Sequence, residues 1–155
     1  MSKGEFFSPK TLNEALELLN TYREKAVIVN GGTDIVEKIA SKTIDPDAII
    51  YIQDIPELKT ITEDDRFVCI GGAATYDDIL SSPLCRQFAG LQQAVAEIGS
   101  PAIRVVGTPA GNIGTAVPAA DCNVPLVALN ADIVLASKGG ERIVPAKDMF
   151  IGYCK

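Results

Sequence analysis

A short apolar run that ends in a glycine pair constrains the fold of this chain more than any other feature. The run Ala26-Val27-Ile28-Val29 has the pattern of a buried β-strand, and it leads straight into Asn30-Gly31-Gly32. A second apolar run follows at residues 48–52. The spacing predicts a helix over residues 33–41 and parallel pairing of the two strands, since parallel strands need such a crossover. We therefore expect a βαβ-like lobe in the first third of the chain.

A capped amphipathic helix is predicted before the first of these strands. Thr11-Leu12-Asn13-Glu14 matches the capping box, in which the Glu14 side chain would accept from the Thr11 amide. The residues that follow place one apolar stripe at helical spacing, which consists of Leu12, Ala15, Leu16 and Leu19.

The remainder of the chain predicts a second, larger α+β lobe with a mixed sheet. Thr75-Tyr76-Asp77-Asp78 repeats the capping pattern at the start of an expected helix. Gly, Pro, Ala, Thr and Asn dominate residues 99–118, which predicts a long irregular loop of the kind that is often functional. We place the lobes at residues 1–57 and 58–155. The predicted elements of the second lobe are hairpin strands at 58–62 with 66–70 and 133–137 with 142–144, and helices at 76–81 and 91–98.

Composition excludes several classes of function. The chain has no histidine, which excludes Ser-His and Cys-His catalysis and histidine metal ligands. Its net charge of −6 argues against nucleic acid as a partner. No apolar run approaches the roughly 20 residues that cross a bilayer, and no signal peptide is visible, so we expect a cytoplasmic protein with no membrane partner.

The cysteines lack the spacing of a metal site. Zinc and iron–sulfur centres usually use closely spaced pairs, and none occurs here. We interpret the thiols as buried, and we expect a bound cofactor to carry any chemistry. The four cysteines are Cys69, Cys85, Cys122 and Cys154.

Two glycine-rich turns are the candidate binding elements. Asn30-Gly31-Gly32-Thr33-Asp34 joins a strand to a helix, and Thr108-Pro109-Ala110-Gly111-Asn112 lies within the predicted loop. Free amides at such turns hold phosphate oxygens, although glycine also serves plain turn geometry in many α/β folds. Asp121 fits either a hydrogen-bond acceptor for ribose or ribitol hydroxyls or a helix N-cap. The residues alone leave these alternatives open.

The ordered set of motifs resembles the FAD-binding domain family of the molybdopterin dehydrogenases, which includes the flavoprotein subunits of xanthine and carbon monoxide dehydrogenases. Asn30-Gly31-Gly32-Thr33-Asp34 is similar to the family's A-G-G-T-D-type turn. The resemblance covers essentially the whole chain. Its other elements are Ile70-Gly71-Gly72-Ala73-Ala74-Thr75, Ile98-Gly99-Ser100, Ile103-Arg104, Thr108, Gly111-Asn112-Ile113, Pro118-Ala119-Ala120-Asp121, Leu129-Asn130-Ala131, Pro145 and Asp148-Met149-Phe150.

The resemblance implies a two-lobed α+β fold of the vanillyl-alcohol-oxidase type with FAD extended between the lobes. It implies a relay of electrons from [2Fe–2S] clusters to NAD⁺ or another acceptor. The molybdenum cofactor would lie on a large partner subunit and the clusters on a small one, and this chain would hold no catalytic or metal-ligating residue. The cofactor-binding positions that it implies are Val29, Asn30, Gly31, Gly32, Thr33, Asp34, Ile98, Thr108, Ala110, Gly111, Asn112 and Asp121.

Three departures from the family pattern favour an alternative, a docking or assembly module of such a complex that has lost its flavin. Asn30 stands where alanine is common, and it could crowd the first turn or add a polar contact to it. Pro109 removes one amide donor from the second turn. Family subunits also continue into a C-terminal domain, which we expect to be absent from this chain.

Overall fold

The computed structural model of the chain describes residues 4–117 and 120–152. Cys154 and the Pro118-Ala119 part of the signature motif lie outside the described residues. Among the residues that are described, no helix is both long and apolar enough to cross a membrane. Within the same ranges, no three acidic, cysteine or histidine side chains are grouped so that they could hold a metal ion.

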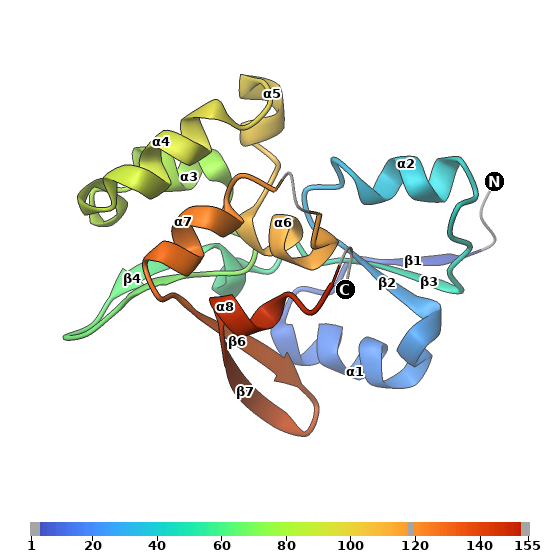
Figure 1. The fold of residues 1–155 in the computed structure, drawn as a ribbon. Coiled ribbons are helices and arrows are strands. Elements are labelled where there is room, and N and C mark those ends of the chain that lie inside the picture. The colour runs from blue at the N-terminus through green and yellow to red at the C-terminus, as the bar shows by residue number, and fades with distance from the viewer. Residues whose placement is uncertain (1–3, 118–119, 153–155) are drawn as a thin grey trace.

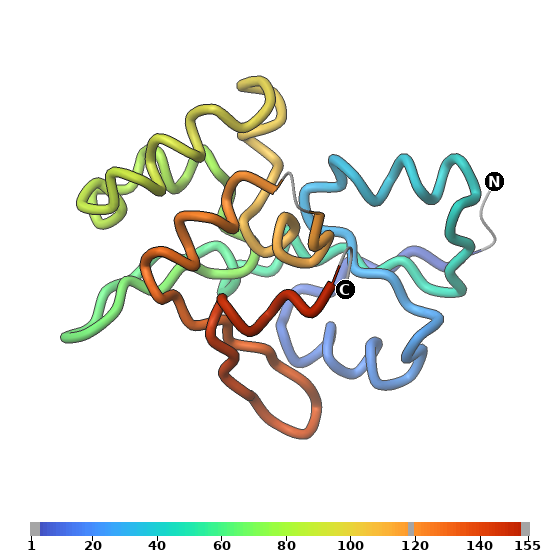
Figure 2. Tube along the Cα trace, viewed as in Figure 1, coloured from blue at the N-terminus to red at the C-terminus, as the bar shows by residue number. Residues whose placement is uncertain are grey.

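The first lobe is built on a three-stranded parallel sheet of order β1-β3-β2. Strand β3 (Ala48–Tyr51) pairs with β2 (Ala26–Val29), and this confirms the parallel pairing predicted from the two apolar runs. On its other edge β3 pairs with β1 (Glu5–Phe7), a strand that the sequence analysis did not predict. Figure 1 shows helices α1 (Leu12–Tyr22) and α2 (Ile35–Ala40) on opposite faces of this sheet, and the tube in Figure 2 follows the same path.

The start of α1 differs from the predicted capping box in one bond. The Thr11 hydroxyl accepts from the Glu14 amide at 3.2 Å, as predicted. The Glu14 carboxylate, however, accepts from the amide of Lys10 at 2.7 Å and not from the amide of Thr11. The chain thus enters the helix with the Lys10 amide facing the Glu14 side chain, and only the Thr11 half of the capping box is present.

The second lobe carries the remaining helices and two separate hairpins. Strand β4 (Ile61–Glu63) pairs with β5 (Val68–Ile70), and β6 (Asp132–Ser137) pairs with β7 (Gly140–Pro145), both antiparallel. These hairpins form two sheets in place of the single mixed sheet that was expected. The α-helices of the second lobe are α3 (Tyr76–Ser81), α4 (Ala89–Glu97), α5 (Pro101–Arg104), α6 (Pro109–Thr115), α7 (Asn123–Ala128) and α8 (Ala146–Met149). The 3₁₀ helices among the described residues of both lobes are η1 (Arg23–Lys25), η2 (Pro56–Lys59) and η3 (Leu84–Gln87).

Residues 99–118 are more ordered than predicted, since α5 and α6 lie within them. Helix α6 begins with Thr108 as its N-cap and Pro109 at its first position. Proline suits that position because its fixed φ is helical and the missing N–H has no acceptor within the helix. The pair Thr108-Pro109 was therefore a readable helix signal inside a segment whose glycine content predicted a loop.

Two hydrophobic clusters stabilise the two lobes. The first contains Ala15, Ile50 and Ile55, between α1 and the parallel sheet. The second joins α3, η3, α4 and the start of α7, and its buried members are Tyr76, Ile79, Cys85, Leu91, Val95 and Cys122. The prediction of buried thiols holds for Cys85 and Cys122, whereas Cys69 on β5 is exposed and that part of the prediction was wrong. Cys69 alternates with the half-buried Val68 and Ile70, so it points away from the cluster.

The capping box at α3 has the predicted form and supports a stability prediction. Asp78 accepts from the Thr75 amide at 2.8 Å, and the Thr75 hydroxyl accepts from the Asp78 amide at 3.1 Å. Replacing Asp78 by alanine should lower the free energy of unfolding by about 1 kcal/mol, measured by urea denaturation at pH 7. Asp77→Ala is the matched control, because it removes an equal charge from the same turn without removing the cap bonds. Equal decreases in the free energy of unfolding of the two variants would show that the lost charge, and not the lost cap bonds, causes the effect.

Candidate functional site

The side chain of Asn30 connects three segments that are far apart in the sequence. Its Nδ2 donates to the carbonyl oxygen of Gly72 at 2.7 Å and to Oγ1 of Thr108 at 2.9 Å. Asn30 and Thr108 are both buried, with 8% and 3% of their surface exposed. The two glycine-rich turns therefore meet, together with a third bend at Gly71-Gly72. We call residues 30–32, 71–73 and 106–111 the glycine junction.

The backbones at the glycine junction approach too closely for a side chain at Gly31. A Cβ at Gly31 would overlap the carbonyl group of Val106, with 2.7 Å to its carbon, and would lie 2.9 Å from the Cα of Gly107. Gly32 has a φ of +72°, which L-residues rarely adopt. Gly31 is therefore required because the backbones of the two lobes pack closely there, and Gly32 is required because of its backbone conformation.

The first turn presents amides that are not used by the protein. In the described part of the chain, the N–H groups of Gly31, Gly32, Thr33 and Asp34 donate to no protein acceptor. Asp34 makes no side-chain cap bond to α2, and its carboxylate pairs instead with Lys38 at 2.7 Å. Thr33 and Asp34 are exposed and the two glycines are half-buried, so a ligand can reach this turn. Free amides in this setting fit the oxygens of a phosphate group.

The second turn offers fewer free amides than expected. The Gly111 amide donates to Thr108 Oγ1 at 3.0 Å, and the Asn112 amide donates to the Thr108 carbonyl at 3.0 Å. The expectation that these two amides are free was wrong, because they belong to the capped first turn of α6. The Asn112 side chain also lies in this turn, and its buried Oδ1 atom has no hydrogen-bond partner among the described residues. The second turn therefore holds the first turn in place, and it offers few backbone N–H donors of its own.

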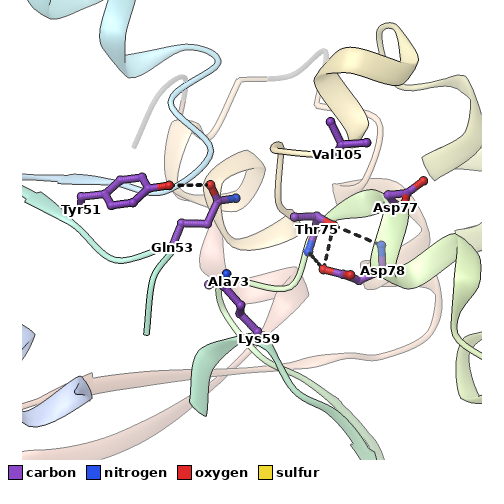
Figure 3. Close-up of a pocket in the computed structure, with 8 residues that line it drawn as sticks. All are labelled: Tyr51, Gln53, Lys59, Ala73, Thr75, Asp77, Asp78 and Val105. Carbon is purple, nitrogen blue, oxygen red and sulfur yellow. Dashed lines mark hydrogen bonds between the residues drawn. The ribbon is translucent and has the colours of Figure 1, made fainter. Parts of the chain in front are cut away.

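A polar cavity of about 350 Å³ adjoins the glycine junction (Figure 3). Ala73 lines it next to Gly72, and Val105 lines it next to Val106. Gln53 also lines the cavity, and its Nε2 donates to the Val106 carbonyl at 2.7 Å, the same group that packs against Gly31. The other lining residues are Tyr51, Lys59, Thr75, Asp77 and Asp78. The cavity has the size of a small-molecule site and polar groups on several walls.

Comparison with known proteins shows the family of the chain. The family described as "FAD binding domain in molybdopterin dehydrogenase" matches residues 2–155. The chain belongs to this family. It is 37% identical to the nicotinate dehydrogenase FAD-subunit of Eubacterium barkeri over 98% of the chain. It is 32% identical to the carbon monoxide dehydrogenase medium chain of Hydrogenophaga pseudoflava over 96% of the chain. The family resemblance inferred from the motifs is thereby confirmed.

The fold of the family is also confirmed by solved structures. A structure of carbon monoxide dehydrogenase from Hydrogenophaga pseudoflava superposes with a TM-score of 0.94 at 31% identity, over 99% of this chain and 54% of that one. This confirms the mixed α+β class expected for the FAD-binding domain family. The chain spans about half the length of the two curated relatives, 52% of each. The lobe boundary at residues 57 and 58 stays a prediction.

Two predicted site residues lie outside the glycine junction. Ile98 is half-buried at the end of α4 and packs against the second hydrophobic cluster, and its carbonyl accepts from Arg104 at 3.0 Å. Asp121 is exposed and precedes α7, whose N-cap is Cys122 without a side-chain cap bond. The N-cap alternative for Asp121 is therefore wrong. Its charge contributes to the raised pKa of Tyr76, after the larger effects of burial and of Cys122.

The remaining predicted residues surround the glycine junction. Val29 is buried at the end of β2, and Ala110 on α6 lies within 3.9 Å of a Cβ placed on Gly72. Neither departure from the family pattern blocks the site. Asn30 is accommodated by two hydrogen bonds, and Pro109 occupies a helix position whose N–H would have no partner in the helix. The two bonds of Asn30 argue against crowding of the first turn, whereas Pro109 still leaves the start of α6 with one amide donor fewer.

The third bend, at Gly71-Gly72, and the residues that contact the junction around it were not predicted as site residues. Gly72, Val106 and Gly107 make the contacts that close the glycine junction, and Gln53 anchors Val106 from the far side. The Gly-Gly pair at 71–72 was visible as part of the motif Ile70-Gly71-Gly72-Ala73-Ala74-Thr75, but it was not among the predicted cofactor-binding positions. A Cβ at Gly71 would lie 2.6 Å from the Leu58 carbonyl carbon, so this glycine also serves close packing.

Proposed function

We propose that this chain binds FAD at the glycine junction and serves as the flavin-binding part of a molybdenum hydroxylase. The observation that carries the proposal is the meeting of both predicted glycine turns through Asn30, with unused amides at residues 31–34 and an open cavity that Ala73 lines next to Gly72. A diphosphate needs hydrogen-bond donors and little negative charge, and the first turn meets both needs because Asp34 is paired with Lys38.

The residues present fit a dinucleotide in distinct ways. The backbone amides of Gly31, Gly32 and Thr33 would hold the diphosphate, with the Thr33 hydroxyl as a further donor. The adjoining cavity would receive one nucleoside half, because Ala73 and Val105 connect its walls directly to the junction. Asp121 and Ile98 lie on the second lobe, where the proposal assigns them to the flavin half. When bound, FAD supplies a carrier that takes up and releases one or two electrons.

The wider role is inferred from the named relatives. The family is that of the molybdopterin dehydrogenases, and two relatives are named as an FAD-subunit and a medium chain. From the family resemblance we assign the chain to a complex with a molybdenum-cofactor subunit and a [2Fe–2S] subunit. In that complex the chain would relay electrons from the clusters to NAD⁺ or another acceptor. Its own residues would contribute binding and orientation, because the flavin itself carries the electrons.

A binding experiment tests the proposal. Isothermal titration of the purified chain with FAD should give one site per chain, and gel filtration should leave a yellow protein with a flavin spectrum. A colourless protein with no binding heat would contradict flavin binding and favour the docking module.

A pair of tryptophan variants tests the position of the cofactor. Val105 lines the cavity and is 53% exposed, so Val105→Trp fills the cavity from its rim and should weaken FAD binding at least about tenfold. Val134→Trp is the matched control, because Val134 on β6 is 56% exposed and lies outside the cavity lining. Since the chain has no tryptophan of its own, each variant also reports flavin proximity by quenching. Equal affinities in the two variants would exclude the cavity from the FAD site.

A further inference from the structure

The side-chain carboxamide of Asn30 donates two hydrogen bonds that neither aspartate nor alanine could donate at this position. Both acceptors of its Nδ2 group, the Gly72 carbonyl and Thr108 Oγ1, lie on the second lobe, 42 and 78 residues along the chain. The Gly72 carbonyl can only accept, which fixes the orientation of the carboxamide. An aspartate there would place acceptor against acceptor, and an alanine would leave the carbonyl without this donor.

The side chain of Asn30 has no donor left for a ligand. An amide nitrogen carries two hydrogens, and both are committed to protein acceptors. The residue is more than nine-tenths buried, and its remaining atom, Oδ1, is itself buried without a partner among the described residues. An acceptor cannot bond to phosphate oxygens, so any effect of the Asn30 side chain on a bound diphosphate must pass through the segments that it holds.

Each segment that Asn30 holds continues directly into a wall of the site. Thr108 Oγ1 also accepts from the Gly111 amide at 3.0 Å, so the same hydroxyl fixes the first turn of α6. Gly72 precedes Ala73, which lines the cavity and whose amide donates to the Leu58 carbonyl at 2.7 Å. Asn30 itself precedes the free amides of residues 31–34. One buried side chain therefore sets the relative position of the three bends.

We propose that Asn30 is a positioning residue that holds the glycine junction in its ligand-receiving arrangement before any ligand binds. This inference rests on the proposed function for its ligand, whereas the ordering itself is a property of the unliganded chain. Without the two bonds the bends must be ordered by the ligand, and that ordering cost lowers the affinity. The ligand is a diphosphate-bridged dinucleotide, and FAD is the probe.

The test combines affinity with hydrogen exchange of the unliganded full chain. Asn30→Ala and Thr108→Val each remove the bond between the two side chains, and Thr108→Ser keeps the hydroxyl as the matched control. We expect each of the first two variants to weaken FAD binding about tenfold or more and Thr108→Ser to stay within about threefold of wild type. The double variant should be weakened much less than the product of the two single effects, because the singles share one bond.

Hydrogen exchange supplies a readout that a general loss of stability would not move. In Asn30→Ala, exchange should accelerate about tenfold or more at the amides of Ala73, Ala74 and Gly111, whereas amides of the β6–β7 hairpin keep wild-type rates. Unchanged exchange at the three junction amides, or a uniform increase across the chain, would overturn the inference. If the wild-type chain fails to bind FAD, the proposed function fails, and the exchange comparison alone decides the role of Asn30. If Asn30→Ala does not fold, Thr108→Val compared with Thr108→Ser gives the same decision.

Discussion

Replacing Gly31 by alanine is expected to lower the free energy of unfolding by about 3 kcal/mol or more and to abolish FAD binding. The added Cβ would overlap the carbonyl group of Val106 and would lie 2.9 Å from the Cα of Gly107. Both obstacles are backbone atoms, which cannot rotate away as a flexible side chain could. The lobes must therefore separate at the glycine junction, which moves the free amides of the first turn away from the cavity.

Thermal and urea denaturation measure the stability of this variant, and calorimetric titration measures its FAD binding. A loss of 3 kcal/mol corresponds to a decrease of about 6–12 °C in Tm for a chain of this size. Gly114→Ala is the matched control, because a Cβ at Gly114 on α6 would meet no atom within 4 Å. Alanine inside a helix should raise stability there by about 0.5–1 kcal/mol. Wild-type stability and affinity in Gly31→Ala would show that the two backbones do not touch in solution.

Alkaline pH should destabilise the chain steeply, by about 1.4 kcal/mol per pH unit for each buried acid group that must ionise. Burial raises the pKa of the Cys122 thiol from 9.0 to about 12. Between these values the unfolded chain has lost the thiol proton and the folded chain keeps it, so stability decreases as pH rises. The contribution of Cys122 is intact below about pH 9, and its loss approaches about 4 kcal/mol by pH 12. Burial also raises the pKa of Tyr76, which adds to the loss above about pH 10.

Urea denaturation under reducing conditions at pH 7, 9, 10 and 11 measures this slope. Cys122→Ala removes the ionisable group, so its stability should decline less steeply above pH 9 by about 1.4 kcal/mol per pH unit, whatever it loses at neutral pH. Cys69→Ala is the control at an exposed thiol and should keep the wild-type slope. Parallel pH profiles for the wild type and Cys122→Ala would contradict the assignment of the alkaline loss to this buried thiol.

Features that depend on neighbouring residues were predicted well. The capping box of Thr75 with Asp78 and the helix at residues 76–81 appear in the structure as predicted, because both arise from contacts three or four positions apart. The parallel pairing of Ala26–Val29 with Ala48–Tyr51 also followed from local patterns, since two buried strands joined through a helix have few other arrangements.

Features that depend on a distant partner were missed or misplaced. Strand β1 has only three residues, and it is a strand because β3 lies beside it. The Glu14 carboxylate accepts from the Lys10 amide in place of the Thr11 amide, so the predicted capping box forms only in part. Residues 99–118 contain two short helices despite a loop-like composition, because the Thr108 cap and tertiary contacts outweigh the weak helix propensity of glycine.

The amino-acid sequence by itself determined the family, the glycine positions and the elements whose signals lie within a few residues of one another. Only the tertiary structure decided which amides remain free: those of residues 31–34 stay available, whereas those of Gly111 and Asn112 are used by Thr108. It also decided that Asn30 joins two segments 42 and 78 residues away. The reason is physical, because a spacing of three or four residues specifies a local hydrogen bond, while a long-range bond exists only after the whole chain has folded around it.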